Sequence, residues 1–160
     1  GDVPLDCEVM ERLVAMPGAS VSDAAHAPEH CLEVQLPFLQ TVLSDFQLVP
    51  ILVGRCPVEA VARVLESLWD DATLIIVSSD LSHYHSYEEA RQLDALTSAR
   101  ILAREERLDG KEACGAAAIN GLMHLAKNHD LNVAALDVRN SGDTAGDRHR
   151  VVGYGAYVLH

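Results

Sequence analysis

Basic residues, long apolar runs and targeting signals are all scarce in this sequence. There are 12 Lys and Arg residues against 24 Asp and Glu residues, so the formal net charge is −12 and the protein repels phosphate groups. We therefore expect no nucleic-acid partner and no membrane partner. No apolar run approaches the roughly 20 residues that span a bilayer. Because neither a secretory signal nor a polybasic segment is recognisable, we expect a soluble, cytoplasmic protein.

Cysteine motifs and aromatic residues are also rare. The irregular spacing of the cysteines, with no C-x-x-C pair, argues against a zinc ribbon or a thioredoxin-like motif. Aromatic residues make up 4% of the chain, but 49% of its residues are hydrophobic, which is enough for the core of one domain. In a cytoplasmic protein, most cysteines are reduced and act as small buried hydrophobic residues. The four cysteines are Cys7, Cys31, Cys56 and Cys114.

The hydrophobic periodicity predicts helices that alternate with short strands. Predicted helices cover Leu5–Ala15, Pro28–Leu43, Val58–Trp69, Tyr87–Ala103 and Gly115–Lys127. Predicted strands cover Gln47–Gly54, Thr73–Val77, Leu131–Val138 and Val151–Leu159. Strands separated by helices favour an α/β fold with a mainly parallel or mixed sheet flanked by helices.

The run Ser78–Tyr84 follows the apolar segment Thr73–Val77 directly. Ligand sites of open α/β sheets gather at the carboxyl ends of such strands. Asp80 and His83 are therefore candidates for an orienting carboxylate and an acid/base imidazole. The alternative is that Asp80 caps the next turn and His83 is merely solvated.

Three further places contain reactive or polar side chains. Glu29 and Glu33 flank His30 at the start of a predicted helix, where a capping or surface role is the alternative. Cys114 precedes a predicted helix, whose dipole favours a thiolate, although a core cysteine is the simpler interpretation. The oxygen-rich loop Asn140–Asp147 does not match the spacing of an EF-hand, so we interpret it as a turn at the edge of a pocket. Its candidate pocket-lining residues are Asn140 and Asp143.

Taken together, these motifs resemble a known family. The segments Ala27–Leu39, Ser78–Tyr84, Cys114–Gly115 and Asn140–Asp143 occur in the same order in Memo-like proteins. That family is also called AmmeMemoRadiSam system protein B. It resembles the class III extradiol ring-cleaving dioxygenases.

The resemblance implies an α/β fold with a mononuclear metal held by two histidines and one cysteine, beside a catalytic-type histidine. Carried over by motif, His30 is similar to the second metal histidine and Cys114 to the thiolate ligand. His83 is similar to the acid/base residue, with Asp80 beside it, and Glu29, Glu33, Asn140 and Asp143 are expected to line the pocket. The resemblance favours iron, while the soft thiolate also suits copper or zinc.

The first metal histidine of the family belongs to an N-terminal His-Ala-Gly motif, which has no counterpart here. We therefore expect residues 1–160 to form a single Memo-like domain that lacks the family's N-terminal strands. A site with only two of the three protein ligands should bind metal weakly or not at all. The exposed sheet edge is expected to favour a homo-oligomer.

The resemblance implies a metal-dependent redox protein, of dioxygenase type, acting on an unknown small-molecule substrate. The family name suggests a radical-SAM system partner. The main alternative is a non-catalytic module that binds a small ligand or peptide in the same pocket. A thiol hydrolase using Cys114, His83 and Asp80 is a third hypothesis, but nothing in the sequence supplies an oxyanion hole.

Overall fold

The computed structural model describes residues 1–144 and 146–160 and divides the chain into two compact units, Gly1–Gly54 and Arg55–His160. Ala145, inside the predicted loop Asn140–Asp147, lies outside the described residues. Among the residues that the structure describes, no helix is long and apolar enough to cross a membrane.

The N-terminal unit contains the short helices α1 (Cys7–Val14), α2 (Asp23–His26) and α3 (Leu36–Val42). Helix α1 begins after Asp6, whose Oδ1 accepts a hydrogen bond from the Val9 N–H at 2.9 Å and so caps the first turn. Leu13 is the one buried residue of residues 1–54, all of which are described, and it is still 8% exposed. Most other apolar side chains of this unit are only partly buried or exposed.

The predicted helix Pro28–Leu43 is shorter than expected. Residues 31–35 form turns, and α3 begins only at Leu36, with Pro37 in its first turn. Proline lacks an N–H and its ring clashes with the carbonyl four residues earlier, so a continuous helix through Pro37 is disfavoured. The candidate residues Glu29, His30 and Glu33 consequently lie outside any helix.

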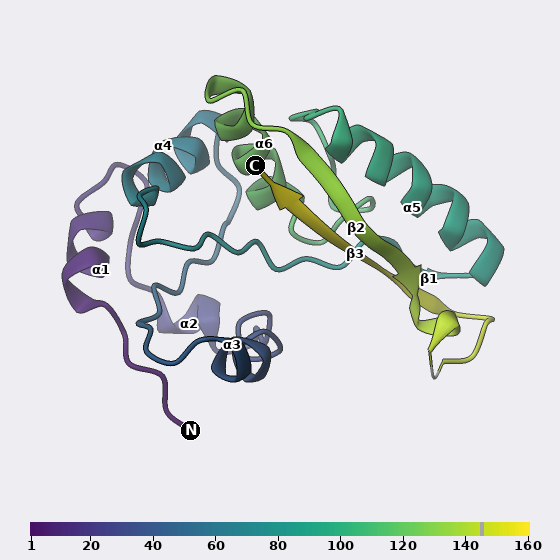
Figure 1. Ribbon diagram of the computed structural model, residues 1–160, viewed down its shortest axis with the longest axis horizontal. Coiled ribbons are helices and arrows are strands. Elements are labelled where there is room, and N and C mark those ends of the chain that lie inside the picture. Colours follow the sequence, from purple (N-terminus) through teal and green to yellow (C-terminus); the bar gives the residue numbers. More distant parts are fainter. Residues whose placement is uncertain (145) are drawn as a thin grey trace. The chain divides into compact units, whose positions relative to one another are not determined.

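The C-terminal unit contains three helices and a small sheet. Its elements are α4 (Val58–Leu68), β1 (His83–His85), α5 (Tyr87–Leu102), α6 (Ala116–Asn128), β2 (Val133–Asn140), the 3-10 helix η1 (Ser141–Asp143) and β3 (Val151–Leu159). The strand order is β1–β3–β2. Helix α5 packs against β2 and β3, and α4 packs against α6 (Figure 1).

The chain is α/β as predicted, but the prediction of a mainly parallel or mixed sheet is wrong, because both described strand pairs are antiparallel. Strands β2 and β3 follow each other without a crossover helix, and consecutive strands joined in this way can only pair antiparallel. Residues 74–77 belong to no β-ladder among the described residues, and residues 47–54 form only an isolated bridge between Leu48 and Leu5. In the described part of the chain, two of the four predicted strands therefore belong to no sheet.

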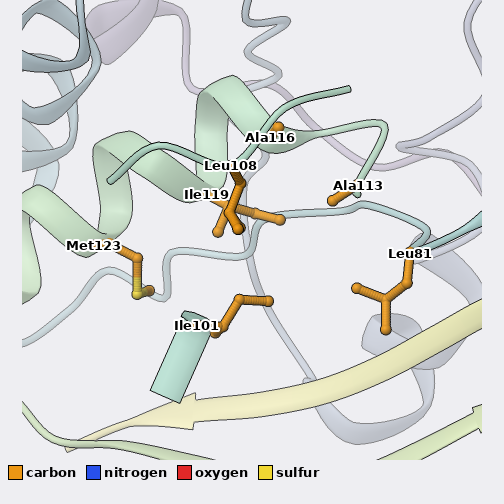
Figure 2. Packing of buried hydrophobic residues seen from close by; sticks show 7 residues of the cluster. All are labelled: Leu81, Ile101, Leu108, Ala113, Ala116, Ile119 and Met123. Carbon is orange, nitrogen blue, oxygen red and sulfur yellow. The ribbon is translucent and has the colours of Figure 1, made fainter. Parts of the chain in front are cut away.

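The core of the C-terminal unit includes residues next to Asp80 and next to Cys114. Figure 2 shows the buried cluster, which is formed by Leu81, Ile101, Leu108, Ala113, Ala116, Ile119 and Met123. Leu81 is 2% exposed and Ala113 is fully buried. Because these two residues follow Asp80 and precede Cys114, burial of the apolar side chains anchors the neighbouring polar ones.

Candidate functional site

The segment that contains Asp80 and His83 is held against β3. Leu81 N–H donates to Gly153 O at 2.9 Å, and Gly153 N–H donates to Ser82 O at 2.8 Å. His83 then begins β1 and pairs with Val152 of β3. The side chains of Asp80 and His83 thus project from a backbone that is already fixed by strand-like hydrogen bonds.

Cys114 lies just before α6 and is joined to Asp80 by two hydrogen bonds. Cys114 N–H donates to Asp80 O at 3.2 Å, and Asp80 N–H donates to Cys114 Sγ at 3.1 Å. These two hydrogen bonds hold Cys114 Sγ beside the Asp80 backbone. Cys114 lies before a helix, as the sequence predicts, and the structure adds Asp80 as its hydrogen-bond partner.

The next residue, Gly115, allows the start of α6 to lie close to the Ser79–Asp80 backbone. Its N–H donates to Ser79 Oγ at 2.9 Å, and a Cβ at Gly115 would lie 2.8 Å from Ser79 Cβ. A larger residue would push the start of α6 away from the Ser79–Asp80 backbone. The contact between Cys114 and Asp80 therefore depends on a glycine at this position.

Asp80, His83 and Cys114 form a group of potential metal ligands. One ligand atom from each lies within 4.8 Å of the others, and Asp80 Oδ2 is 3.4 Å from His83 Nε2. Metal–ligand bonds of about 2.0–2.3 Å in a tetrahedral site imply ligand separations of about 3.3–3.8 Å, so the Asp80–His83 pair already has the required spacing. The oxygen, nitrogen and sulfur donors fit a transition metal such as iron, copper or zinc.

The group is open to solvent on one side. The side chains of Asp80 and His83 are 45% and 31% exposed, and Cys114 is also exposed. A metal held here would therefore be within reach of a small molecule from solution. Among the described residues, this is the one group of three or more potential ligands.

Tyr84 has a backbone conformation that bulky residues rarely adopt. Its φ is +64°, in the left-handed region, and it directly follows His83. The Arg150 guanidinium lies 4.9 Å from the centroid of the Tyr84 ring. Strained residues of this kind cluster at functional sites. No role was expected for Tyr84 or Arg150 from the sequence, because neither periodicity nor spacing indicates a positive φ.

Asn140 and Asp143 lie at the end of β2 and organise η1. Asn140 Oδ1 accepts the Gly142 N–H, and Asp143 Oδ2 accepts the Asn140 N–H, both at 2.9 Å. Tyr87 OH donates to Asp143 Oδ1 at 2.5 Å. This hydrogen bond is the main reason that the pKa of Asp143 is lowered and that of Tyr87 is raised.

Asn140 and Asp143 also line a cavity of about 400 Å³ between α5 and β2. Arg91, Asp94 and Arg139 line it with them, whereas the metal-ligand group does not. Asn140 and Asp143, which were predicted to line the same pocket as His83, therefore line a separate cavity.

The remaining candidates lie in the N-terminal unit. Glu29 and Glu33 line a cavity of about 40 Å³ together with His26 and Cys31. His30 is exposed in the connection between α2 and α3. The three residues that converge, Asp80, His83 and Cys114, all belong to the C-terminal unit, so their geometry does not depend on His30.

Comparisons with known proteins agree with the resemblance noted in the sequence. A family model described as "Memo-like protein" matches residues 1–158. A MEMO1 family protein of Aquifex aeolicus (strain VF5) is 36% identical over 96% of this chain and 62% of its own length. Another, from Archaeoglobus fulgidus, is 35% identical over 99% of this chain and 65% of its own length.

A third MEMO1 family protein, from Methanobrevibacter smithii, is 33% identical over 99% of this chain and 62% of its own length. The chain thus spans somewhat less than two thirds of the length of these relatives. The match includes every segment that forms the candidate site. This chain belongs to the Memo-like family.

Proposed function

We propose that this chain holds a transition metal through Asp80, His83 and Cys114 and performs oxidoreductase chemistry related to that of non-haem metal dioxygenases. The observation that supports the proposal is the convergence of the three ligand atoms within 4.8 Å of one another. They come from two segments far apart in the sequence and joined by the hydrogen bonds between Asp80 and Cys114.

Iron is the metal that we propose, with copper and zinc as competitors for the thiolate. A bound metal would supply a Lewis-acid or redox centre for a substrate entering from solution. The chain's own residues would prepare that centre. The Asp80 N–H holds Cys114 Sγ in place, and Asp80 Oδ2 lies 3.4 Å from His83 Nε2, a separation that suits two ligands of one metal ion.

The same 3.4 Å approach favours a second arrangement of roles. A carboxylate beside an imidazole also fixes the ring of an acid/base histidine. In this arrangement His83 moves a proton to or from the substrate, and His30 joins Cys114 as a metal ligand, as the family resemblance implies. The two arrangements differ in whether His83 or His30 is needed for metal binding.

A Co²⁺ titration of the reduced protein tests the proposal. Bonding to Cys114 should give a sulfur-to-cobalt absorption band, which Cys114→Ala should abolish, while His83→Ala and Asp80→Ala should weaken binding. Matched controls are Cys56→Ser and His85→Ala, because neither residue belongs to the ligand group. A Cys114→Ala variant that binds Co²⁺ with the parent's band and affinity would overturn the assignment. Loss of binding in His30→Ala, with binding retained in His83→Ala, would select the second arrangement.

Oxygen consumption tests the proposed chemistry separately. The Fe²⁺-loaded protein should consume oxygen in the presence of a catechol-type or thiol substrate, and this uptake should depend on Cys114. Tight, metal-independent binding of a small ligand or peptide, with no uptake for any substrate tried, would instead favour a non-catalytic binding module.

A further inference from the structure

The buried stripe of α5 includes an acidic residue. Ala90, Asp94, Thr97 and Ile101 follow helical spacing and are all buried, and Asp94 is only 2% exposed. A carboxylate in such a place is costly unless hydrogen bonds satisfy it. Asp94 Oδ1 accepts the backbone N–H of Ser82 at 2.9 Å in a buried hydrogen bond. Asp94 therefore contacts the segment that contains the candidate ligands.

Strand β3 binds the carbonyl group of Ser82. Gly153 N–H donates to Ser82 O at 2.8 Å, and Leu81 N–H donates to Gly153 O at 2.9 Å. Gly153 also lies against Asp94, because a Cβ at Gly153 would be 2.1 Å from Asp94 Oδ2. Only glycine lets the carboxylate and β3 approach Ser82 together. Ser82, which is 1% exposed, is thus fixed at both its N–H and its carbonyl.

We propose that Asp94 is a positioning residue for the metal-ligand group. By holding Ser82, it sets the spacing and direction of Asp80 and His83, which lie on either side of the Leu81–Ser82 pair. The inference rests on the proposed metal-binding function and assigns to α5 a part in it. Ligands must be held within about 0.5 Å of their working geometry, and residues behind them usually provide that restraint.

The strained residue after His83 supports this role. A φ of +64° at Tyr84 persists only where the surroundings impose it. The hydrogen bonds of Ser82 with Asp94 and Gly153 restrain the chain two residues before Tyr84. The ligand segment is therefore restrained on its buried side while its ligand atoms stay accessible from solution.

The test compares three variants by Co²⁺ titration of the full chain, with absorption and affinity as readouts. Asp94→Leu removes the acceptor for Ser82 N–H, so Co²⁺ affinity should fall about 10- to 100-fold and the bands should shift. Asp94→Asn keeps a side-chain oxygen as acceptor, so it should retain the parent's bands and lose less affinity. The matched control is Asn120→Leu. Asn120 is also buried on a helix, and it holds the backbone of Leu108 by two hydrogen bonds of 2.9 Å.

Asn120→Leu should lower thermal stability without moving the cobalt bands. If Asp94→Leu keeps the parent's bands and affinity, or if Asn120→Leu shifts them equally, Asp94 is not a positioning residue. If Asp94→Leu does not fold, Asp94→Ser replaces it with the same expected result, because the serine hydroxyl is too short to reach Ser82 N–H. A parent protein without a Cys114-dependent band would instead overturn the proposed function, so the two failures are distinguishable.

Discussion

The backbone of Asp80 is hydrogen bonded to Cys114 in both directions. Asp80 N–H donates to Cys114 Sγ at 3.1 Å, and Asp80 O accepts the Cys114 N–H at 3.2 Å. This pairing joins the extended segment before β1 to the turn before α6. It brings an imidazole, a carboxylate and a thiol from two distant segments to one place.

Gly115→Ala should disturb this pairing. The added methyl group would lie 2.8 Å from Ser79 Cβ and 3.1 Å from Ser78 O, so α6 must shift. We expect a loss of about 1–3 kcal/mol in the free energy of unfolding, measured in urea, and weaker Co²⁺ binding. Gly110→Ala is the control, because nothing lies within 4 Å of a Cβ there. Equal effects of the two substitutions would contradict the account of the Cys114 turn.

Tyr84 should reveal backbone strain when its two smallest replacements are compared. Both Tyr84→Gly and Tyr84→Ala remove the ring and its contact with Arg150, but only glycine adopts a φ of +64° without strain. The glycine variant should therefore be more stable than the alanine variant by about 1 kcal/mol. Chemical denaturation of both proteins measures the difference. An alanine variant of equal or greater stability would show that the position is unstrained.

Glu106 should contribute stability that is lost in acid. Its pKa is lowered by hydrogen bonds from Lys127, at 2.8 Å, and from His124, at 2.9 Å. A carboxyl whose folded-state pKa is lowered stabilises the fold above its unfolded-state pKa of about 4.3, and this stability disappears as the pH falls through the lower folded-state value.

The Glu106→Gln variant should thus lose under about 1 kcal/mol at pH 7 and show a shallower decline of stability below about pH 5. Urea unfolding between pH 3 and pH 7 measures both effects. Glu11→Gln is the matched control, because Glu11 is an exposed helix residue without a described side-chain partner. Parallel declines for Glu106→Gln and the parent would contradict the prediction.

We propose that the segment at residues 74–77, which contains two exposed apolar side chains, mediates self-association. Leu74 and Ile76 are 68% and 44% exposed, and the backbone between them belongs to no described ladder. Such a segment can pair with the same segment of a second chain. Sedimentation velocity should show association that Leu74→Lys reduces and that Val21→Lys, at an equally exposed valine, leaves unchanged. Association that is insensitive to Leu74→Lys would exclude this surface.

The sequence indicated three residues that lie together in the structure, but it did not indicate the sheet around them. Asp80 and His83 were expected after the apolar segment Thr73–Val77, and Cys114 before a helix, and these three do converge. The apolar segment itself was predicted as a strand. A strand needs a partner as well as a pattern, and residues 74–77 have none in the described part of the chain.

Hydrophobic periodicity could not predict strand β1 or the contact between Asp94 and Ser82. Strand β1 (His83–His85) is only three residues long, so no alternation could indicate it. Asp94 did leave a signal, because it lies on the apolar stripe of α5 with Ala90 and Ile101. Its partner, the Ser82 N–H, could not be inferred, since the contact depends on how α5 packs against β3.

X-ray absorption spectroscopy of the metal-loaded protein tests the central claim most directly. The account predicts a sulfur neighbour at about 2.3 Å from the metal, together with nitrogen and oxygen neighbours at about 2.0–2.2 Å. The sulfur neighbour should disappear in Cys114→Ala and persist in Cys56→Ser. A metal environment of nitrogen and oxygen alone in the parent protein, or a sulfur neighbour that survives Cys114→Ala, would contradict the account.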